Sequence, residues 1–178
     1  MKKVKIGLIG FGTIGKGVYN LLEKNSEIIK ERSDFKFEIK SICDLDTSII
    51  KKETKKINIT DNWEDIVNDK EIDLVIELIG GIEPAKTILI ESLKNGKNVV
   101  TANKKLLAEE GNEIFMIANS VEQSIGFEAA VGGGIPCILS LKHGLVANNI
   151  KSVIGILNGT TNYILTQMKE TGADFNDV

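Results

Sequence analysis

A short apolar run followed at once by three spaced glycines is the feature that most constrains the fold of this chain. Val4–Ile9 is apolar enough for a buried parallel strand, and residues 10–15 follow the pattern Gly-x-Gly-x-x-Gly. Apolar residues then recur at the spacing of an amphipathic helix, at Ile14, Val18, Leu21 and Leu22. A strand, a glycine-rich turn and a helix in this order predict a dinucleotide-binding unit.

The three glycines have separate predicted tasks in that unit. Gly10 permits the tight turn, Gly12 lets a pyrophosphate approach the backbone, and Gly15 lets the helix pack against the strand. The free N–H groups at the helix start and the helix dipole attract the same anion. A tight turn without a ligand is the alternative. The predicted cofactor-binding residues of the turn are Gly10, Phe11, Gly12, Thr13, Ile14 and Gly15.

Strand and helix patterns alternate along the rest of the chain, which predicts an α/β fold with a Rossmann-type doubly wound, mostly parallel sheet. The further expected strands are 35–43, 57–59, 73–79, 98–101 and 125–129. Helices are expected from Asp61 or Asn62 to Val67, from 83–84 to about 95, and from Asn103 to 123 with a break at Gly111. Residues 49–56 suggest a charged surface segment. The first domain is expected to comprise residues 1–130.

A second domain is expected to begin at residue 131 and to be incomplete at residue 178. Its predicted elements are a helix over 136–146, a strand over 152–157 and a helix over 160–169. An Asn-Gly turn at 158–159 precedes Thr160 and Thr161, either of which can cap the last helix. The polar cluster from Asn158 to Tyr163 can alternatively face a substrate.

Composition excludes several classes of partner. The 178 residues carry a net charge of −3, and Arg32 is the only arginine, so a nucleic-acid partner is not expected. No run approaches the ~20 apolar residues of a membrane span. Cys43 and Cys137 lie far apart, which predicts neither a metal site nor a disulfide and favours the reducing cytoplasm.

Two further features point to the cofactor. Asp44 follows the second predicted strand, where an acid accepts the ribose hydroxyls of NAD, whereas a nearby base would favour the phosphate of NADP. The next base is Lys51, so NAD is favoured, with dual use or a merely solvated aspartate as alternatives. Gly80 and Gly81 follow a buried strand, where a cofactor can lie against the backbone; a plain turn is equally compatible.

Lys104 is the residue expected to take part in the chemistry. Asn103 is a good helix cap, which places Lys104 in the first helical turn. A cation there interacts unfavourably with the helix dipole, at a cost of a few tenths to ~1 kcal/mol. A function is therefore expected, either holding a carboxylate or cofactor group or relaying a proton.

Residues 128–136 contain Glu128 and three glycines, which offer a carboxylate and free carbonyl oxygens. These groups suit a cation. Alternatively, the glycines form a hinge.

Together these segments resemble homoserine dehydrogenase. The matching stretches are 10–15, 77–85, 101–104, 128–136 and 155–165, in the order found in the family. The resemblance implies NAD(P)-dependent interconversion of L-aspartate 4-semialdehyde and L-homoserine, in threonine, methionine and isoleucine biosynthesis. It implies that Lys104 is an active-site lysine, and that a monovalent cation, usually sodium, is bound at Glu128, Val131, Gly133 and Ile135.

The resemblance also implies that residues 131–178 begin an α+β substrate and dimerisation domain, and that the whole protein is a homodimer. The chain is therefore expected to bind cofactor but to lack part of the catalytic domain of the family. Cys43 stands where many members carry an arginine that contacts the NADP phosphate. Two alternatives stay open: a cofactor-binding module without activity, and another semialdehyde-type dehydrogenase using a cysteine such as Cys137, with only His143 near it in sequence.

Overall fold

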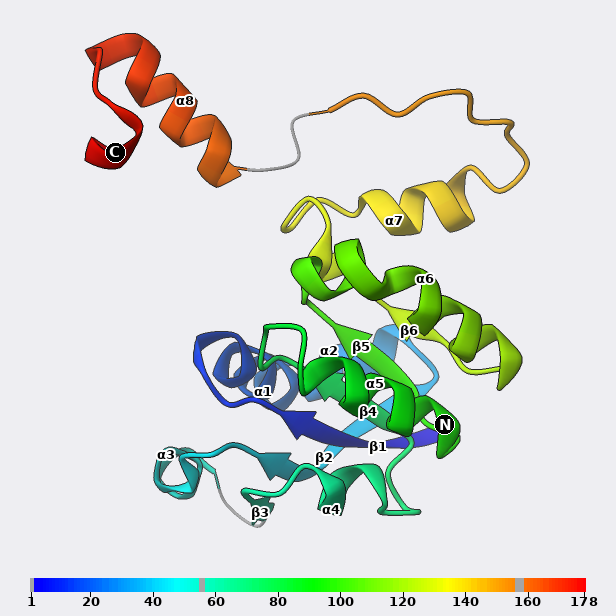
Figure 1. Ribbon diagram of the computed structural model, residues 1–178. Coiled ribbons are helices and arrows are strands. Elements are labelled where there is room, and N and C mark those ends of the chain that lie inside the picture. Colours follow the sequence, from blue (N-terminus) through cyan, green and yellow to red (C-terminus); the bar gives the residue numbers. More distant parts are fainter. Residues whose placement is uncertain (1, 55–56, 156–158) are drawn as a thin grey trace. The chain divides into compact units, whose positions relative to one another are not determined.

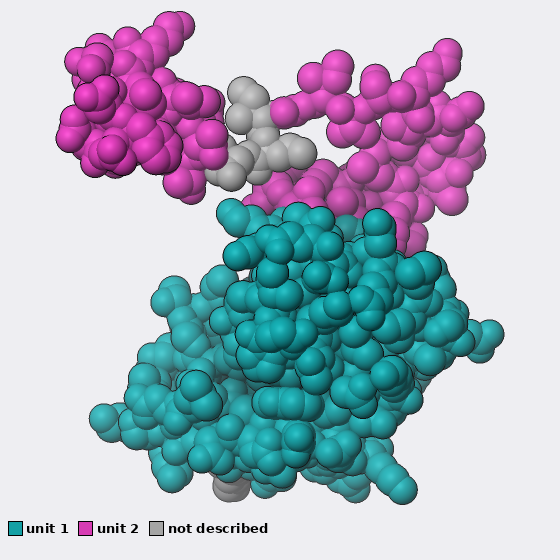
Figure 2. All heavy atoms as spheres, in the orientation of Figure 1, with its two compact units in different colours: residues 1–130 teal, residues 131–178 magenta. Residues whose placement is uncertain are grey.

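A computed structural model describes residues 2–54, 57–155 and 159–178 of the chain. The chain forms two compact units, residues 1–130 and residues 131–178 (Figure 2). In the part of the chain that is described, no helix is both long and apolar enough to cross a membrane.

Six parallel strands form one sheet in the first unit, in the spatial order β3-β2-β1-β4-β5-β6 (Figure 1). They are β1 (Lys2–Ile9), β2 (Phe35–Cys43), β3 (Asn58–Thr60), β4 (Leu74–Glu77), β5 (Asn98–Thr101) and β6 (Ile125–Gly126). The strand order reverses between β1 and β4, which is the point where doubly wound sheets bind ligands at the carboxyl ends of their strands. The predicted fold class is confirmed.

Helices cover both faces of this sheet. They are α1 (Thr13–Lys24), α2 (Ser26–Arg32), α3 (Thr47–Glu53), α4 (Glu64–Val67), α5 (Ala85–Lys94), α6 (Lys104–Ser120) and a 3-10 turn, η1 (Glu128–Ala130). In Figure 1, α5 crosses in front of the strands and α2 lies behind them.

Successive residues of one strand belong to opposite faces, because side chains alternate along a strand. Leu8, Ile42 and Ile76 pack in one cluster with residues of α1 and α3. Their chain neighbours Ile9, Cys43 and Val75 pack in the other cluster with residues of α4, α5 and α6. Burial of both faces accounts for the continuous apolar runs by which the strands were predicted.

Several predicted boundaries in the first unit were wrong. Residues 47–53, which overlap the predicted charged surface segment, form the helix α3, which was not predicted; the Asp46 carboxylate accepts the N–H of Ser48 and so caps it. The predicted break at Gly111 is absent, and α6 runs unbroken through this buried glycine. The last predicted strand keeps only Ile125 and Gly126, since residues 128–130 turn into η1.

The regular structure described in the second unit is helical. It contains α7 (Cys137–Leu139), which continues as a π-helical turn (Ser140–Gly144), then α8 (Gly159–Thr171) and a 3-10 turn (Phe175–Asp177). The predicted strand 152–157 is wrong over 152–155, which have no regular structure and no partner strand among the described residues; 156–158 lie outside them. The α8 helix begins one residue before Thr160, so the two threonines lie in its first turn.

Candidate cofactor site

The β1–α1 turn leaves no room for a side chain at two positions, Gly10 and Gly15. Gly10 has a φ of +98°, and a Cβ there would lie 2.8 Å from the main-chain carbonyl group of Leu78. A Cβ on Gly15 would overlap the carbonyl oxygen of Gly10, so α1 starts directly against the turn. A Cβ on Gly12 meets no atom within 4 Å, which leaves open space in front of the turn.

The side chain of Phe11 anchors the turn to the core. It is 2% exposed and lies edge-on to Tyr19 of α1, with 5.9 Å between the ring centroids. Any contact between Phe11 and a ligand therefore has to come from its backbone. Thr13 and Ile14 are exposed in the first turn of α1, where free N–H groups are available to an anion.

Asp44 lies beside this turn at the end of β2. Its Oδ2 accepts the N–H of Phe11 at 2.6 Å, and its Oδ1 accepts the N–H of Asp46 at 3.0 Å. The N–H of Gly10 donates to the carbonyl of Cys43, one residue earlier. The carboxylate predicted to accept ribose hydroxyls thus also helps to hold the glycine turn against β2.

A pocket of about 460 Å³ opens at the carboxyl ends of β1, β2 and β4. Four of the predicted residues line it, namely Gly10, Gly12, Asp44 and Gly80. Its apolar walls suit a flat ring such as adenine. These walls are formed by Ile9, Leu45, Trp63, Leu78, Ile79, Pro84 and Ile88. The charged groups among the described lining residues are Asp44 and Asp61, with no lysine, arginine or histidine.

The sequence interpretation missed the part of this pocket that comes from the β3–α4 connection. Asp61 and Trp63 were considered only as the start of a helix, yet they line the pocket beside Asp44. The available signal was the strand order expected for this fold, because a loop that follows β3 has to lie at the same sheet edge as the glycine turn.

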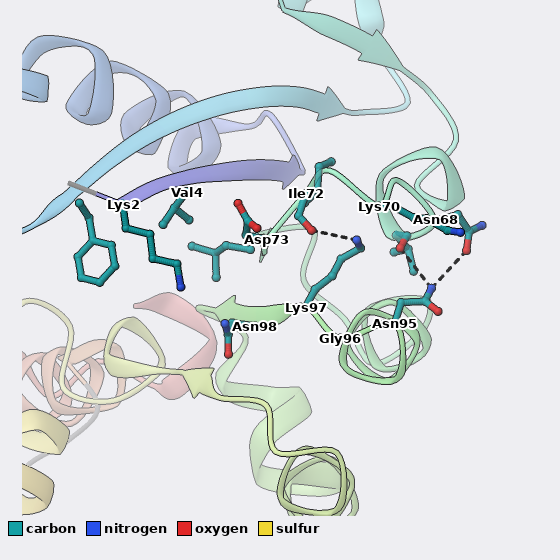
Figure 3. Close-up of a pocket in the computed structure, with 13 residues that line it drawn as sticks. Lys2, Val4, Asn68, Lys70, Ile72, Asp73, Asn95, Gly96, Lys97 and Asn98 are labelled. Carbon is teal, nitrogen blue, oxygen red and sulfur yellow. Dashed lines mark hydrogen bonds between the residues drawn. The ribbon is translucent and has the colours of Figure 1, made fainter.

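A larger hollow of about 890 Å³ lies at the opposite edge of the sheet, where the strands begin (Figure 3). Lys97 extends from just before β5, and its ammonium donates to the carbonyls of Asp69 at 2.6 Å and Ile72 at 3.0 Å. Because open parallel sheets bind their ligands at the carboxyl ends of the strands, the smaller pocket is the candidate site.

Lys104 directly follows Asn103, which bonds to the Gly80–Gly81 turn, and Lys104 does not line the pocket. Gly80 and Gly81 have φ values of +73° and +75°. The Nδ2 of Asn103 donates to the carbonyl of Gly81 at 2.5 Å, and its Oδ1 accepts the N–H of Leu106 at 3.1 Å. Asn103 therefore caps α6 as predicted, and Lys104 is the exposed first residue of that helix.

The predicted cation ligands are divided between the two units. Glu128 lies in η1, whereas the other three follow in a loop in which Gly132 and Gly133 have positive φ. The Val131 carbonyl accepts the Cys137 thiol at 3.5 Å, and the Ile135 carbonyl accepts the Cys137 N–H at 2.8 Å. Carbonyl oxygens with one carboxylate are the hard ligands that sodium takes. A cluster of three or more His, Cys, Asp or Glu is absent from the described residues.

Cys43 differs from an activated cysteine. It is buried, and this burial, with a smaller effect from the neighbouring Asp44 charge, raises the pKa of its thiol to about 11. Nucleophilic cysteines have a lowered pKa instead. Both cysteines are free.

Comparisons with known proteins identify one family over most of the chain. Residues 10–128 match the model described as "Homoserine dehydrogenase, NAD binding domain", and residues 136–178 match the model "Homoserine dehydrogenase". The chain is 46% identical over its whole length to a homoserine dehydrogenase of Neisseria gonorrhoeae and 45% identical to one of Pseudomonas aeruginosa. It spans 41% of the length of each of these relatives.

Solved structures give the same result. A homoserine dehydrogenase from Thiobacillus denitrificans matches 99% of this chain and 41% of its own chain, with a TM-score of 0.90 and 44% identity. A hyperthermophilic archaeal homoserine dehydrogenase in complex with NADPH matches 98% of this chain and 59% of its own, with a TM-score of 0.79 and 26% identity.

Proposed function

We propose, from the premise that this chain belongs to the homoserine dehydrogenase family, that it binds NAD(H) or NADP(H) as part of an oxidoreductase that interconverts L-homoserine and L-aspartate 4-semialdehyde. The main support for cofactor binding is the β1–α1 turn, where open space in front of Gly12 adjoins the apolar pocket. We place this activity in cytoplasmic threonine, methionine and isoleucine biosynthesis, with the whole protein a homodimer.

Each part of the site has a proposed contact with the cofactor. Backbone N–H groups at Gly12, Thr13 and Ile14 hold the pyrophosphate, and Asp44 accepts from the ribose. The apolar walls of the pocket enclose the adenine. The backbone at Gly80 and Gly81 borders the rest of the cofactor. When bound, the nicotinamide exchanges a hydride with the carbon that is an alcohol in one substrate and an aldehyde in the other.

Lys104 is the proposed catalytic residue and also borders the cofactor. Its position at the start of α6, joined by Asn103 to the turn at Gly81, supports this role. There its ammonium can hold a substrate group or transfer the hydroxyl proton. We assign residues 1–130 to the dinucleotide-binding domain and residues 131–178 to the beginning of the substrate and dimerisation domain.

NAD(H) is the preferred cofactor in this proposal. Asp44 and Asp61 line the pocket without a cationic side chain among the described lining residues. The 2′-phosphate of NADP would bring like charges together near the ribose, which is unfavourable. Cys43 adds no compensating positive charge.

Trp63 provides the test, because it is the single tryptophan and it lines the pocket. NADH is expected to quench Trp63 fluorescence by energy transfer, with NADPH binding at least ~10-fold more weakly, a difference of about 1.4 kcal/mol. Asp61→Asn should narrow that difference and leave NADH affinity nearly unchanged. Asp44→Asn should weaken NADH binding, because it alters the acceptor of the ribose hydroxyls, and it should narrow the difference as well. If neither NADH nor NADPH binds, the proposed function is refuted. If NADPH binds more tightly than NADH, only the proposed preference for NAD(H) is refuted.

A sodium ion is the second proposed ligand, held by Glu128 and the carbonyls of Val131, Gly133 and Ile135. Replacing sodium chloride with choline chloride at constant ionic strength should lower the Tm of the chain, because a ligand that binds the folded state stabilises it. Glu128→Gln should remove the difference between the two salts. Equal Tm values for the unaltered chain in both salts would count against the site.

A further inference from the structure

Glu77, the last residue of β4, is a fully buried carboxylate. Its Oε1 accepts the N–H groups of Ile79 at 2.8 Å and Gly80 at 3.2 Å, and its Oε2 accepts the Thr101 hydroxyl at 2.6 Å. Among the described residues no ion pair includes it. Burying a carboxylate costs free energy, and here three neutral donors compensate for that cost. This arrangement indicates that the carboxylate has a structural role at this position.

The hydrogen bonds continue from Thr101 to the start of α6. Glu77 and Thr101 are direct partners in the β4–β5 register. The Thr101 hydroxyl oxygen accepts the N–H of Asn103 at 3.0 Å. The amide of Asn103 then reaches back to the carbonyl of Gly81. Thr101 is 0% and Asn103 8% exposed, so hydrogen bonds of three buried side chains, those of Glu77, Thr101 and Asn103, join the exposed 79–81 turn to the α6 N-terminus in a ring.

A carboxylate meets the requirements of this ring better than an amide. The Thr101 hydroxyl has one proton to donate, and its oxygen already accepts from Asn103. An acceptor is therefore needed opposite that proton, and Oε2 supplies it. A glutamine with its oxygen on the Ile79 and Gly80 amides would point its NH₂ group, a donor, at the Thr101 hydroxyl, whose own proton would then lose the acceptor that Oε2 provides.

We propose that Glu77 is a positioning residue that locks the Gly80–Gly81 turn to the first turn of α6. The two glycines have positive φ and no side chains that could pack, so the turn is held through its backbone: the Glu77 carboxylate accepts the Gly80 N–H, and Asn103 donates to the Gly81 carbonyl. The turn that borders the cofactor and the helix that carries Lys104 then keep one relative geometry. This inference rests on the proposed function only for the tasks of Gly80 and Lys104.

The test compares four variants of the 178-residue chain. Glu77→Gln and Thr101→Val interrupt the ring, whereas Thr101→Ser keeps the hydroxyl. Lys97→Met is the matched control, because it removes a buried, hydrogen-bonded polar group at the opposite edge of the sheet. Amide hydrogen exchange is followed by NMR at Gly80 and Leu106, and NADH affinity by Trp63 fluorescence.

Glu77→Gln should accelerate exchange at both amides relative to the rest of the sheet and weaken NADH binding by about tenfold or more, as misplacing aligned groups does. Thr101→Val should accelerate amide exchange at Leu106 and weaken NADH binding. Thr101→Ser should keep the exchange rate and the NADH affinity of the unaltered chain. Lys97→Met should lower the Tm without a selective change at these amides or in NADH affinity.

Faster exchange at Gly80 with Leu106 unchanged in Glu77→Gln overturns the coupling, as does identical behaviour of Thr101→Val and Thr101→Ser. Unchanged NADH affinity in both interrupted variants overturns the positioning role. If Glu77→Gln does not fold, the two Thr101 variants decide. If the unaltered chain does not bind NADH, the proposed function fails, while the exchange data still decide whether the ring is coupled.

Discussion

At the scale of single residues, two neighbours at the end of β2 have unlike environments. The carboxylate of Asp44 accepts N–H groups at the glycine turn, whereas the Cys43 side chain packs in the core on the α4–α6 face of the sheet. Side-chain alternation along the strand separates them. The absence of an arginine at position 43 was visible in the sequence, but the burial of its thiol was not.

Cys43 should be nearly unreactive in the folded chain. With a pKa of about 11, about one thiol in a thousand is ionised at pH 8, compared with about a quarter for an ordinary thiol. We expect iodoacetamide to modify Cys43 at least ~100-fold more slowly in the native chain than in the urea-unfolded chain, as measured by mass spectrometry of the peptide. Equal rates would contradict the burial described for this residue.

At the scale of elements, two glycines of α1 make a matched pair. A Cβ at Gly15 meets the backbone of the turn, which cannot move aside, whereas Gly17 is exposed and has no atom within 4 Å of an added Cβ. Gly15→Ala should lower the free energy of unfolding by about 1–3 kcal/mol. It should also abolish cofactor binding, because it displaces the turn.

Gly17→Ala should instead raise the free energy of unfolding by up to ~1 kcal/mol, because alanine has the higher helix propensity. Urea unfolding measures both changes, and NADH titration measures binding. Similar effects of the two substitutions would mean that α1 does not pack against the turn as described.

At the scale of the whole first unit, an ion network joins segments far apart in the sequence. Lys40 of β2 lies 2.6 Å from Asp69 and 2.7 Å from Glu71, and Lys5 of β1 lies 3.1 Å from Glu71. The hydrogen bond from Lys40, followed by that from Lys5, lowers the pKa of Glu71. Burial acts to raise the pKa of Asp69, but the hydrogen bond from Lys40 and further contacts outweigh it and lower that pKa.

Stability should therefore fall in acid. Both carboxyl groups have a lower pKa in the folded state than in the unfolded state, so the unfolded chain binds protons first as the pH drops below about 4–5. Their contribution is present at neutral pH and is lost as the pH falls through the folded pKa values. Thermal unfolding between pH 6 and pH 3 should show a steeper loss of Tm for the unaltered chain than for Lys40→Met. Parallel curves would exclude this network as a source of the acid sensitivity.

The sequence by itself determined the features that depend on residues close together in the chain. The β1–turn–α1 unit, the cap of α6 by Asn103 and the alternation of strands and helices all follow from patterns within about twenty residues. The same local reasoning failed where a neighbour outside the window decides. It placed a break at Gly111, which is buried within an unbroken α6, and a strand at 152–155, where no partner strand is present among the described residues.

Only the tertiary structure decided that the β3–α4 connection shares the candidate cofactor pocket. Asp61 and Trp63 reach it because β3 pairs with β2. Glu77 was predicted only as part of the strand over residues 73–79, and its partner Thr101 lies 24 positions away. Local patterns specify backbone conformation, whereas the order in which strands pair specifies which side chains meet, and that order is an outcome of packing the whole sheet.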